Sequence, residues 1–122
     1  MRLEFDVLPL QTRHEFNIAR AAAPPQRRNV WVRVIDDDGA EGWGEAAPNA
    51  FYAENADTVA EVLPVYARVL ANADSSDVDS IERRLLEAAP SRHPKYPPHP
   101  SARSAISAAI LDLSARRAGV PA

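Results

Sequence analysis

The side chains that could do chemistry in this sequence are mostly carboxylates, and a notable group lies between residues 36 and 45. Asp36, Asp37 and Asp38 precede Gly39, and Glu45 follows a Gly-Trp-Gly unit. A hard cation needs converging oxygens, whereas three adjacent side chains point in different directions. Because aspartate and glycine favour tight turns, the run predicts a solvated hairpin turn. A buried Glu45 could act as a general base, but the pattern favours a carboxylate paired with an arginine or a backbone amide.

Basic and nucleophilic groups are sparse. The chain has no cysteine, which excludes disulfides and thiol chemistry. His14, His93 and His99 lack the spacing of a zinc site. His14 is predicted to pack on a strand, and the other two, which stand among prolines, to lie at the surface. Lys95 is the only lysine, so these residues cannot supply a pair of lysines as acid and base.

Length and charge exclude several classes of protein. With 122 residues and 13.3 kDa, the chain is expected to be one domain. A net charge of −3 is unfavourable for binding nucleic acid. No apolar run approaches the roughly 20 residues of a membrane span, and the N-terminus lacks the pattern of a signal peptide. We therefore expect a cytoplasmic protein that binds neither nucleic acid nor membrane.

The elements that must position these side chains begin with strands. Alternation at Leu3, Phe5 and Val7 predicts a first strand, in which Pro9 favours an edge position or a break, and similar alternation predicts a second strand over residues 12–19. Residues 30–35 and 42–44 predict a hairpin around the acidic turn. Its two glycines indicate close approach by another backbone. The expected sheet is antiparallel and has three or four strands.

Three helices are expected to follow, which makes the fold class α+β. Asn55 can cap the first helix, in which Pro64 predicts a kink or a split. Ser76 with Asp79 resembles a capping box for the second helix. Pro100 suits the first turn of the third. That helix carries a stripe of small and apolar residues: Ala102, Ala105, Ile106, Ala109 and Leu113. A domain this small cannot cover every apolar face, so we expect an exposed patch formed by part of this stripe and Trp31 or Trp43.

Two stretches resemble a known family. Val-x-Val-Arg-Val at residues 30–34, the acidic turn, and Gly-Trp-Gly-Glu-Ala-Ala-Pro at residues 42–48 resemble the N-terminal capping domain of the enolase superfamily, muconate-lactonizing subgroup. Residues 48–55 are similar to the Pro-x-Ala-Arg-Tyr-Gly-Glu-Ser loop of dipeptide epimerases, but Phe51 and Ala53 stand where that pattern has Arg and Gly. Residues 105–121 are similar to the segment that leads such chains into their barrel.

The resemblance implies that residues 1–122 form the capping domain of a Mg²⁺-dependent dipeptide epimerase, an isomerase that acts by α-proton abstraction. The catalytic lysines and the Mg²⁺ ligands of such enzymes lie in a C-terminal barrel domain, which is absent from these residues. This segment alone is therefore expected to be inactive, with no catalytic residue and no metal ligand of its own. The implied partners are the barrel of the same enzyme and a dipeptide substrate, and the full-length enzyme is expected to be a homo-oligomer.

By the same resemblance, two loops of the cap select the substrate, one at residues 20–25 and one at residues 48–54. Phe16 and Tyr52 are expected to form apolar walls of the substrate site, and Arg20 to pair with a substrate carboxylate. Two other functions stay open. The cap could belong to a muconate cycloisomerase or an o-succinylbenzoate synthase, or the chain could be a stand-alone interaction module without activity.

Overall fold

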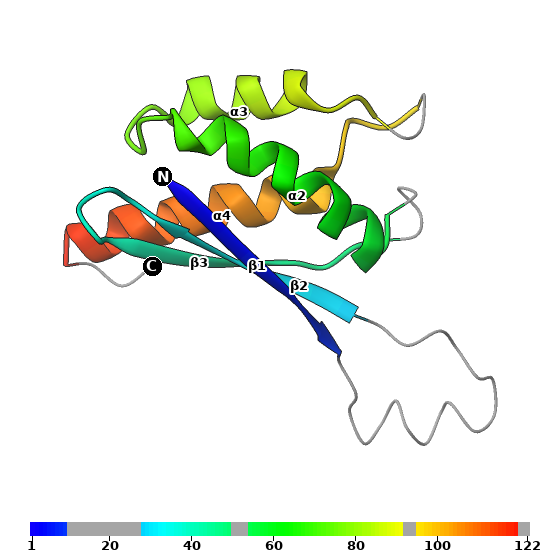
Figure 1. Cartoon of the computed structure of the whole chain (residues 1–122), viewed down its shortest axis with the longest axis horizontal. Helices are drawn as coiled ribbons and strands as arrows, with labels where there is room; N and C mark the ends of the chain where they lie inside the picture. The colour runs from blue at the N-terminus through cyan, green and yellow to red at the C-terminus, as the bar shows by residue number, and fades with distance from the viewer. Residues whose placement is uncertain (10–27, 50–53, 92–94, 120–122) are drawn as a thin grey trace.

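A computed structural model of the chain describes residues 1–9, 28–49, 54–91 and 95–119. Three strands are followed by three helices: β1 (Arg2–Pro9), β2 (Arg28–Ile35), β3 (Glu41–Ala46), α2 (Ala56–Ala71), α3 (Val78–Ala88) and α4 (Pro100–Arg117). The strands form one antiparallel sheet in the order β1-β2-β3. Helices α2 and α4 lie on the sheet, and α3 packs against these two helices (Figure 1). The predicted α+β fold is confirmed, and the strand expected over residues 12–19 falls outside the described residues.

The hairpin between β2 and β3 forms as predicted. Asp36 donates its backbone N–H to the carbonyl of Ala40 at 2.8 Å, and Gly39 donates to the carbonyl of Asp36 at 2.9 Å. Gly39 has a φ of +86°, in the left-handed region that glycine adopts without steric cost. On the other side of β2, strand β1 ends at Pro9 opposite Arg28. Among the described strands β1 lies at the edge of the sheet, the position in which a proline is tolerated.

Two glycines of β3 lie directly against the backbone of α4. A Cβ atom built on Gly42 would stand 2.0 Å from the carbonyl oxygen of Ala109, and one on Gly44 would stand 2.1 Å from that of Ala105. Real Cβ atoms essentially never approach other atoms so closely. The predicted close approach of another backbone is therefore confirmed, and its partner is α4.

The α4 stripe is buried, so its expected place in an exposed patch is wrong. Its five residues are at most 1% exposed within the described residues: Ala102, Ala105, Ile106, Ala109 and Leu113. The glycines of β3 let this helix sit directly on the sheet, which uses the stripe inside the domain. Trp43 is 39% exposed, and its ring lies 5.2 Å from that of Trp31 on the outer face of the sheet. Trp43 is therefore exposed, Trp31 is partly buried, and the size of an apolar patch around them stays a prediction.

The structure decides part of two expectations about the helices. Of the kink or split expected at Pro64, the split is absent, since Pro64 lies inside one continuous helix, and the kink stays a prediction. The side chain of Pro64 is exposed, so water can reach the carbonyl that loses its donor. Helix α3 is capped one residue later than predicted, since Asp77 accepts a hydrogen bond from the N–H of Ser80 at 3.3 Å. Ser76 bonds instead to the side chain of Asp74.

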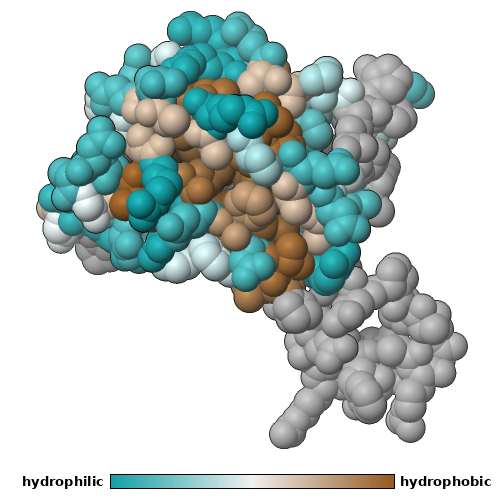
Figure 2. All heavy atoms as spheres, viewed as in Figure 1, coloured by the Kyte–Doolittle hydropathy of each residue, from teal (hydrophilic) through white to brown (hydrophobic). Residues whose placement is uncertain are grey.

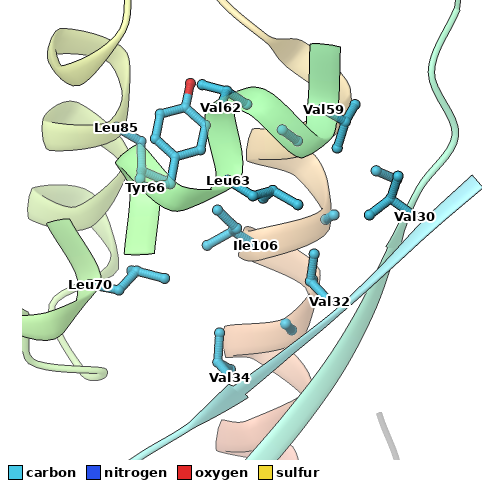
Figure 3. Packing of buried hydrophobic residues seen from close by; sticks show 14 of the residues in the cluster. Val30, Val32, Val34, Val59, Val62, Leu63, Tyr66, Leu70, Leu85 and Ile106 are labelled. Carbon is cyan, nitrogen blue, oxygen red and sulfur yellow. The ribbon is translucent and has the colours of Figure 1, made fainter. Parts of the chain in front are cut away.

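One hydrophobic core joins the sheet to the helices (Figure 3). Its largest fully buried side chains come from β2, α2, α3 and α4: Val30, Val32, Val34, Val59, Leu63, Tyr66, Leu70, Ile81, Leu85, Ile106, Ile110 and Leu113. On β1, by contrast, Leu3, Phe5 and Val7 are only partly buried. Figure 2 shows apolar side chains gathered in the middle of the face near β1, bordered by hydrophilic ones. None of the helices that the structure describes is long and apolar enough to cross a bilayer.

Candidate functional site

The two segments expected to contact a ligand leave the domain at the same end of the sheet. Strand β1 ends at Pro9, which pairs with Arg28, and strand β3 ends at Ala46, which pairs with Val30. The residues that flank 10–27 and the chain that leads to residues 50–53 therefore lie at one end of the sheet (Figure 1). The predicted ligand-facing residues Phe16, Arg20 and Tyr52 lie in these two segments, outside the described residues. Their roles stay predictions, and the same holds for the packing of His14.

Glu54 fastens the base of the second segment to α4. Its side chain is buried, with the residue 6% exposed. One carboxylate oxygen accepts hydrogen bonds from the backbone N–H of Ser101 at 3.1 Å and from the Ser101 hydroxyl at 2.5 Å. Ser101 is the second residue of α4, where backbone N–H groups lack helical partners and the helix dipole favours an anion. His99 precedes the helix without a side-chain cap, so Glu54 supplies the cap from a distance.

Further hydrogen bonds close the base of this segment and attach it to α2. Glu54 donates its backbone N–H to the carbonyl of Asn49 at 3.2 Å. Asn55 accepts from the N–H of Thr58 at 2.9 Å, and the Thr58 hydroxyl accepts from the N–H of Asn55 at 3.0 Å. This reciprocal pair is a capping box, and it confirms Asn55 as the helix cap. The residues on both sides of residues 50–53 therefore have defined positions relative to α2 and α4.

A buried tyrosine and histidine lie near this anchor, and the surface position predicted for His99 is wrong. His99 is 9% exposed, and its Nε2 lies 3.2 Å from the carbonyl of Pro90. Its ring meets that of Tyr66 edge-on at 6.3 Å. The Tyr66 hydroxyl is buried and has no hydrogen-bond partner among the described residues. Burial raises the pKa of Tyr66 to about 12, with an opposing effect of Arg103 and a reinforcing one of the Glu54 charge.

The aspartates of the hairpin turn lie at the opposite end of the domain and are tied to α4. Arg117 donates to Asp36 at 2.8 Å and to Asp38 at 2.7 Å. Ser75, between α2 and α3, donates its hydroxyl to Asp36 at 2.6 Å. The Ser75 hydrogen bond, followed by Arg117, lowers the pKa of Asp36 to about 2. The turn is confirmed, but the Asp36 side chain, only 14% exposed, is paired rather than solvated.

The other two candidates considered from the sequence, a metal site and Glu45 as a general base, do not form among the described residues. Within residues 1–9, 28–49, 54–91 and 95–119, no three acidic, histidine or cysteine side chains are grouped as a metal site would require. Glu45 is exposed, so it lacks the burial that would raise its basicity. The end of the sheet that carries the two candidate loops, with the anchors at Glu54 and Asn55, therefore stays the candidate functional site.

An antiparallel sheet of three strands with helices on one side defines a small α+β domain, and the part of it that the structure describes holds no group of side chains suited to bind a metal. Residues 4–122 match the family described as "Mandelate racemase / muconate lactonizing enzyme, N-terminal domain". The chain belongs to this family, and its resemblance to the enolase superfamily is confirmed. Among curated proteins, none matches this sequence.

Solved structures show the same fold. A mandelate racemase/muconate lactonizing enzyme from Roseiflexus sp. is 30% identical, with a TM-score of 0.73 over 95% of this chain and 28% of its own. 2-Chloromuconate cycloisomerase from Rhodococcus opacus 1CP is 22% identical (TM-score 0.74, 97% of this chain and 29% of its own). Dipeptide epimerase from Enterococcus faecalis V583 is 15% identical (TM-score 0.76, 96% and 30%). The last two similarities concern the fold alone, and this chain spans less than a third of each protein.

Proposed function

We propose that this chain is the capping domain of a Mg²⁺-dependent dipeptide epimerase, and that it selects the substrate while a barrel domain carries out the chemistry. The observation that carries the proposal is the common origin of the two candidate loops at one end of the sheet, with the base of the second loop fixed by Glu54 and Asn55. Family membership supports the role of a cap. The similarity of residues 48–55 to the epimerase loop supports the choice of reaction.

The chemistry is assigned to groups outside this chain. Mg²⁺, when bound, stabilises the enolate that forms as the α-proton leaves. The described residues offer no ligand set for such an ion, so none of them is given a role in holding it. In the proposal, the cap covers the reaction site, excludes water and contacts the side chains of the dipeptide. Arg20 pairs with a substrate carboxylate, and Phe16 and Tyr52 form apolar walls.

Two other functions have a specific observation in their favour. The similarity of the fold to 2-chloromuconate cycloisomerase and to the muconate lactonizing enzyme of Pseudomonas putida favours a cap for a cycloisomerase, with an o-succinylbenzoate synthase as a further member of that group. The burial of the α4 stripe within the described residues favours a stand-alone module, because a domain with a closed core can fold without a partner.

A graft experiment separates these functions. Residues 1–122 would replace the matching N-terminal part of the E. faecalis dipeptide epimerase and, separately, of the P. putida muconate lactonizing enzyme. The control for each graft is the host's own N-terminal part, rejoined through the same junction. We expect the epimerase graft to exchange the α-proton of some dipeptides in D₂O, followed by NMR. Activity of the muconate graft alone would favour the cycloisomerase function, and inactivity of both would favour the stand-alone module.

A further inference from the structure

Glu54 carries a buried carboxylate whose hydrogen-bond partner is distant in the sequence. A buried carboxylate is costly unless hydrogen bonds replace the water that it loses. Here the replacing hydrogen bonds come from Ser101, which is 47 residues away in the sequence and lies in the first turn of α4. The carboxylate therefore links the end of the 48–54 loop to the start of α4, two segments that are distant in the sequence.

The residue at the N-cap position of α4 does not cap the helix with its side chain. The residue before α4 is His99, which adopts a left-handed conformation with φ +43° and makes no capping hydrogen bond with its side chain. Serine, threonine, aspartate or asparagine at this position would satisfy the first N–H groups by itself. Because Glu54 does so instead, the start of α4 and the end of the 48–54 loop are coupled.

Helix α4, to which the carboxylate is bonded, is itself held closely against the sheet. Its Ala105 and Ala109 lie in backbone contact with Gly44 and Gly42 of β3. In addition, Asp112 accepts a hydrogen bond from the N–H of Trp43 at 2.9 Å. A group fixed to the N-terminus of α4 is thereby fixed relative to the whole sheet.

We propose that Glu54 is a positioning residue, whose carboxylate fixes the base of the 48–54 loop on the N-terminus of α4 and so determines where the loop meets the substrate. The second half of this statement rests on the proposed function, whereas the first half concerns this chain alone. The two halves are therefore tested separately, so that either can fail without the other.

The first test measures amide hydrogen exchange by NMR on residues 1–122, whose core closes within the described residues. In Glu54→Ala we expect the Ser101 amide to exchange at least ~10-fold faster, the size of effect that follows from losing a hydrogen bond to a charged group. Glu54→Gln retains an acceptor oxygen of the same reach, so it should recover most of the protection. The amides of Ile110 and Leu113, in the same helix, should be unchanged. Glu87→Ala, at an exposed position of α3, is the matched control.

An unchanged Ser101 rate in Glu54→Ala would overturn the anchoring. So would an equal acceleration at Ser101, Ile110 and Leu113, because it would show that Glu54 only adds global stability. The second test places the same variants in the epimerase graft. We expect Glu54→Ala to raise KM at least ~10-fold with a smaller change in kcat, and Glu54→Gln to restore KM.

An unchanged KM in an active graft would refute the link from the anchor to the substrate. A graft that is inactive with the unmutated chain would instead count against the proposed function, and the exchange rates of Ser101 would still decide the anchoring.

Discussion

Placing a side chain on either glycine of β3 should destabilise the domain, although valine and alanine are better strand formers than glycine. The reason is the contact with α4. A Cβ atom on Gly42 would lie 2.0 Å from the Ala109 oxygen, and contacts below 3.0 Å essentially do not occur, so β3 and α4 would have to separate by about 1.0 Å. The group that must move is a helix backbone, which cannot rotate away as a flexible side chain can.

The expected loss of stability follows from two opposing effects. Overpacking of a well-packed core costs about 1–3 kcal/mol, and the upper end applies because Ile106, Ile110 and Leu113 on α4 would lose contacts as the helix shifts. The gain in strand propensity returns at most about 1 kcal/mol. Gly42→Ala and Gly44→Ala should each lose about 2 kcal/mol, and the valine variants more. For a domain of this length, 2 kcal/mol corresponds to a fall in Tm of roughly 6–10 °C.

Thermal and urea denaturation of residues 1–122 would measure these losses. The matched control is Glu45→Val on the same strand, where the side chain is exposed on the outer face and the change should stay within ~0.5 kcal/mol. The double variant at Gly42 and Gly44 should lose less than the sum of the single variants, because one displacement of α4 relieves both clashes. If both single variants melt at a higher temperature than the unmutated chain, the glycines are incidental and the packing of α4 on β3 described above is wrong.

Variants at three further positions test the ends of the domain and the buried tyrosine. Asp36→Asn should cost about 1–2 kcal/mol at pH 7, a figure reduced for the exposed Arg117 partner. The lowered pKa of Asp36 adds stability that is fully present above its unfolded value of 3.8 and is lost as pH falls through about 2. Urea titrations should therefore show a much smaller cost at pH 2 than at pH 7, and an equal cost at both would contradict the role of the Asp36 charge. Because the pKa of Tyr66 is raised from 10.0 to about 12, its contribution to stability is present below pH 10.0 and is lost as pH rises toward about 12. Tyr66→Phe should abolish this alkaline loss of stability, and an equal loss in both proteins would show that Tyr66 is not its source. Asn55→Ala should cost about 1 kcal/mol through loss of the capping box, whereas Asn55→Asp should cost little, and equal melting temperatures for the alanine variant and the unmutated chain would contradict the cap.

Much of the fold could be predicted because the strands and helices follow local patterns. The close approach at Gly42 and Gly44 was predictable, but its partner was not identified. The match becomes visible only in the structure. Two residues along a strand span roughly 6.6 Å, and four residues along a helix span roughly 6.0 Å, so Gly-x-Gly fits the spacing from Ala105 to Ala109. Treating this stripe as surplus apolar surface led to the incorrect prediction of an exposed patch on α4.

The candidate site was less predictable, because its contacts join residues far apart in the sequence. The role of Glu54 depends on Ser101, and a carboxylate at a helix N-terminus can be recognised only once the fold brings the two together. The burial of His99 was missed for the same reason, since its proline-rich surroundings are typical of a surface connector. The resemblance of residues 48–55 to a known loop did locate the segment whose base the structure shows to be anchored.

In the proposed function, this chain shapes the substrate site and a separate barrel domain carries the catalytic groups. The most direct measurement is α-proton exchange of dipeptides in D₂O with purified residues 1–122, followed by NMR with and without Mg²⁺. Because Lys95 is the only lysine, the two-lysine mechanism cannot operate, and we predict exchange at the background rate under both conditions. Exchange above background, abolished by denaturing the chain, would contradict this division of labour and place catalysis within these residues.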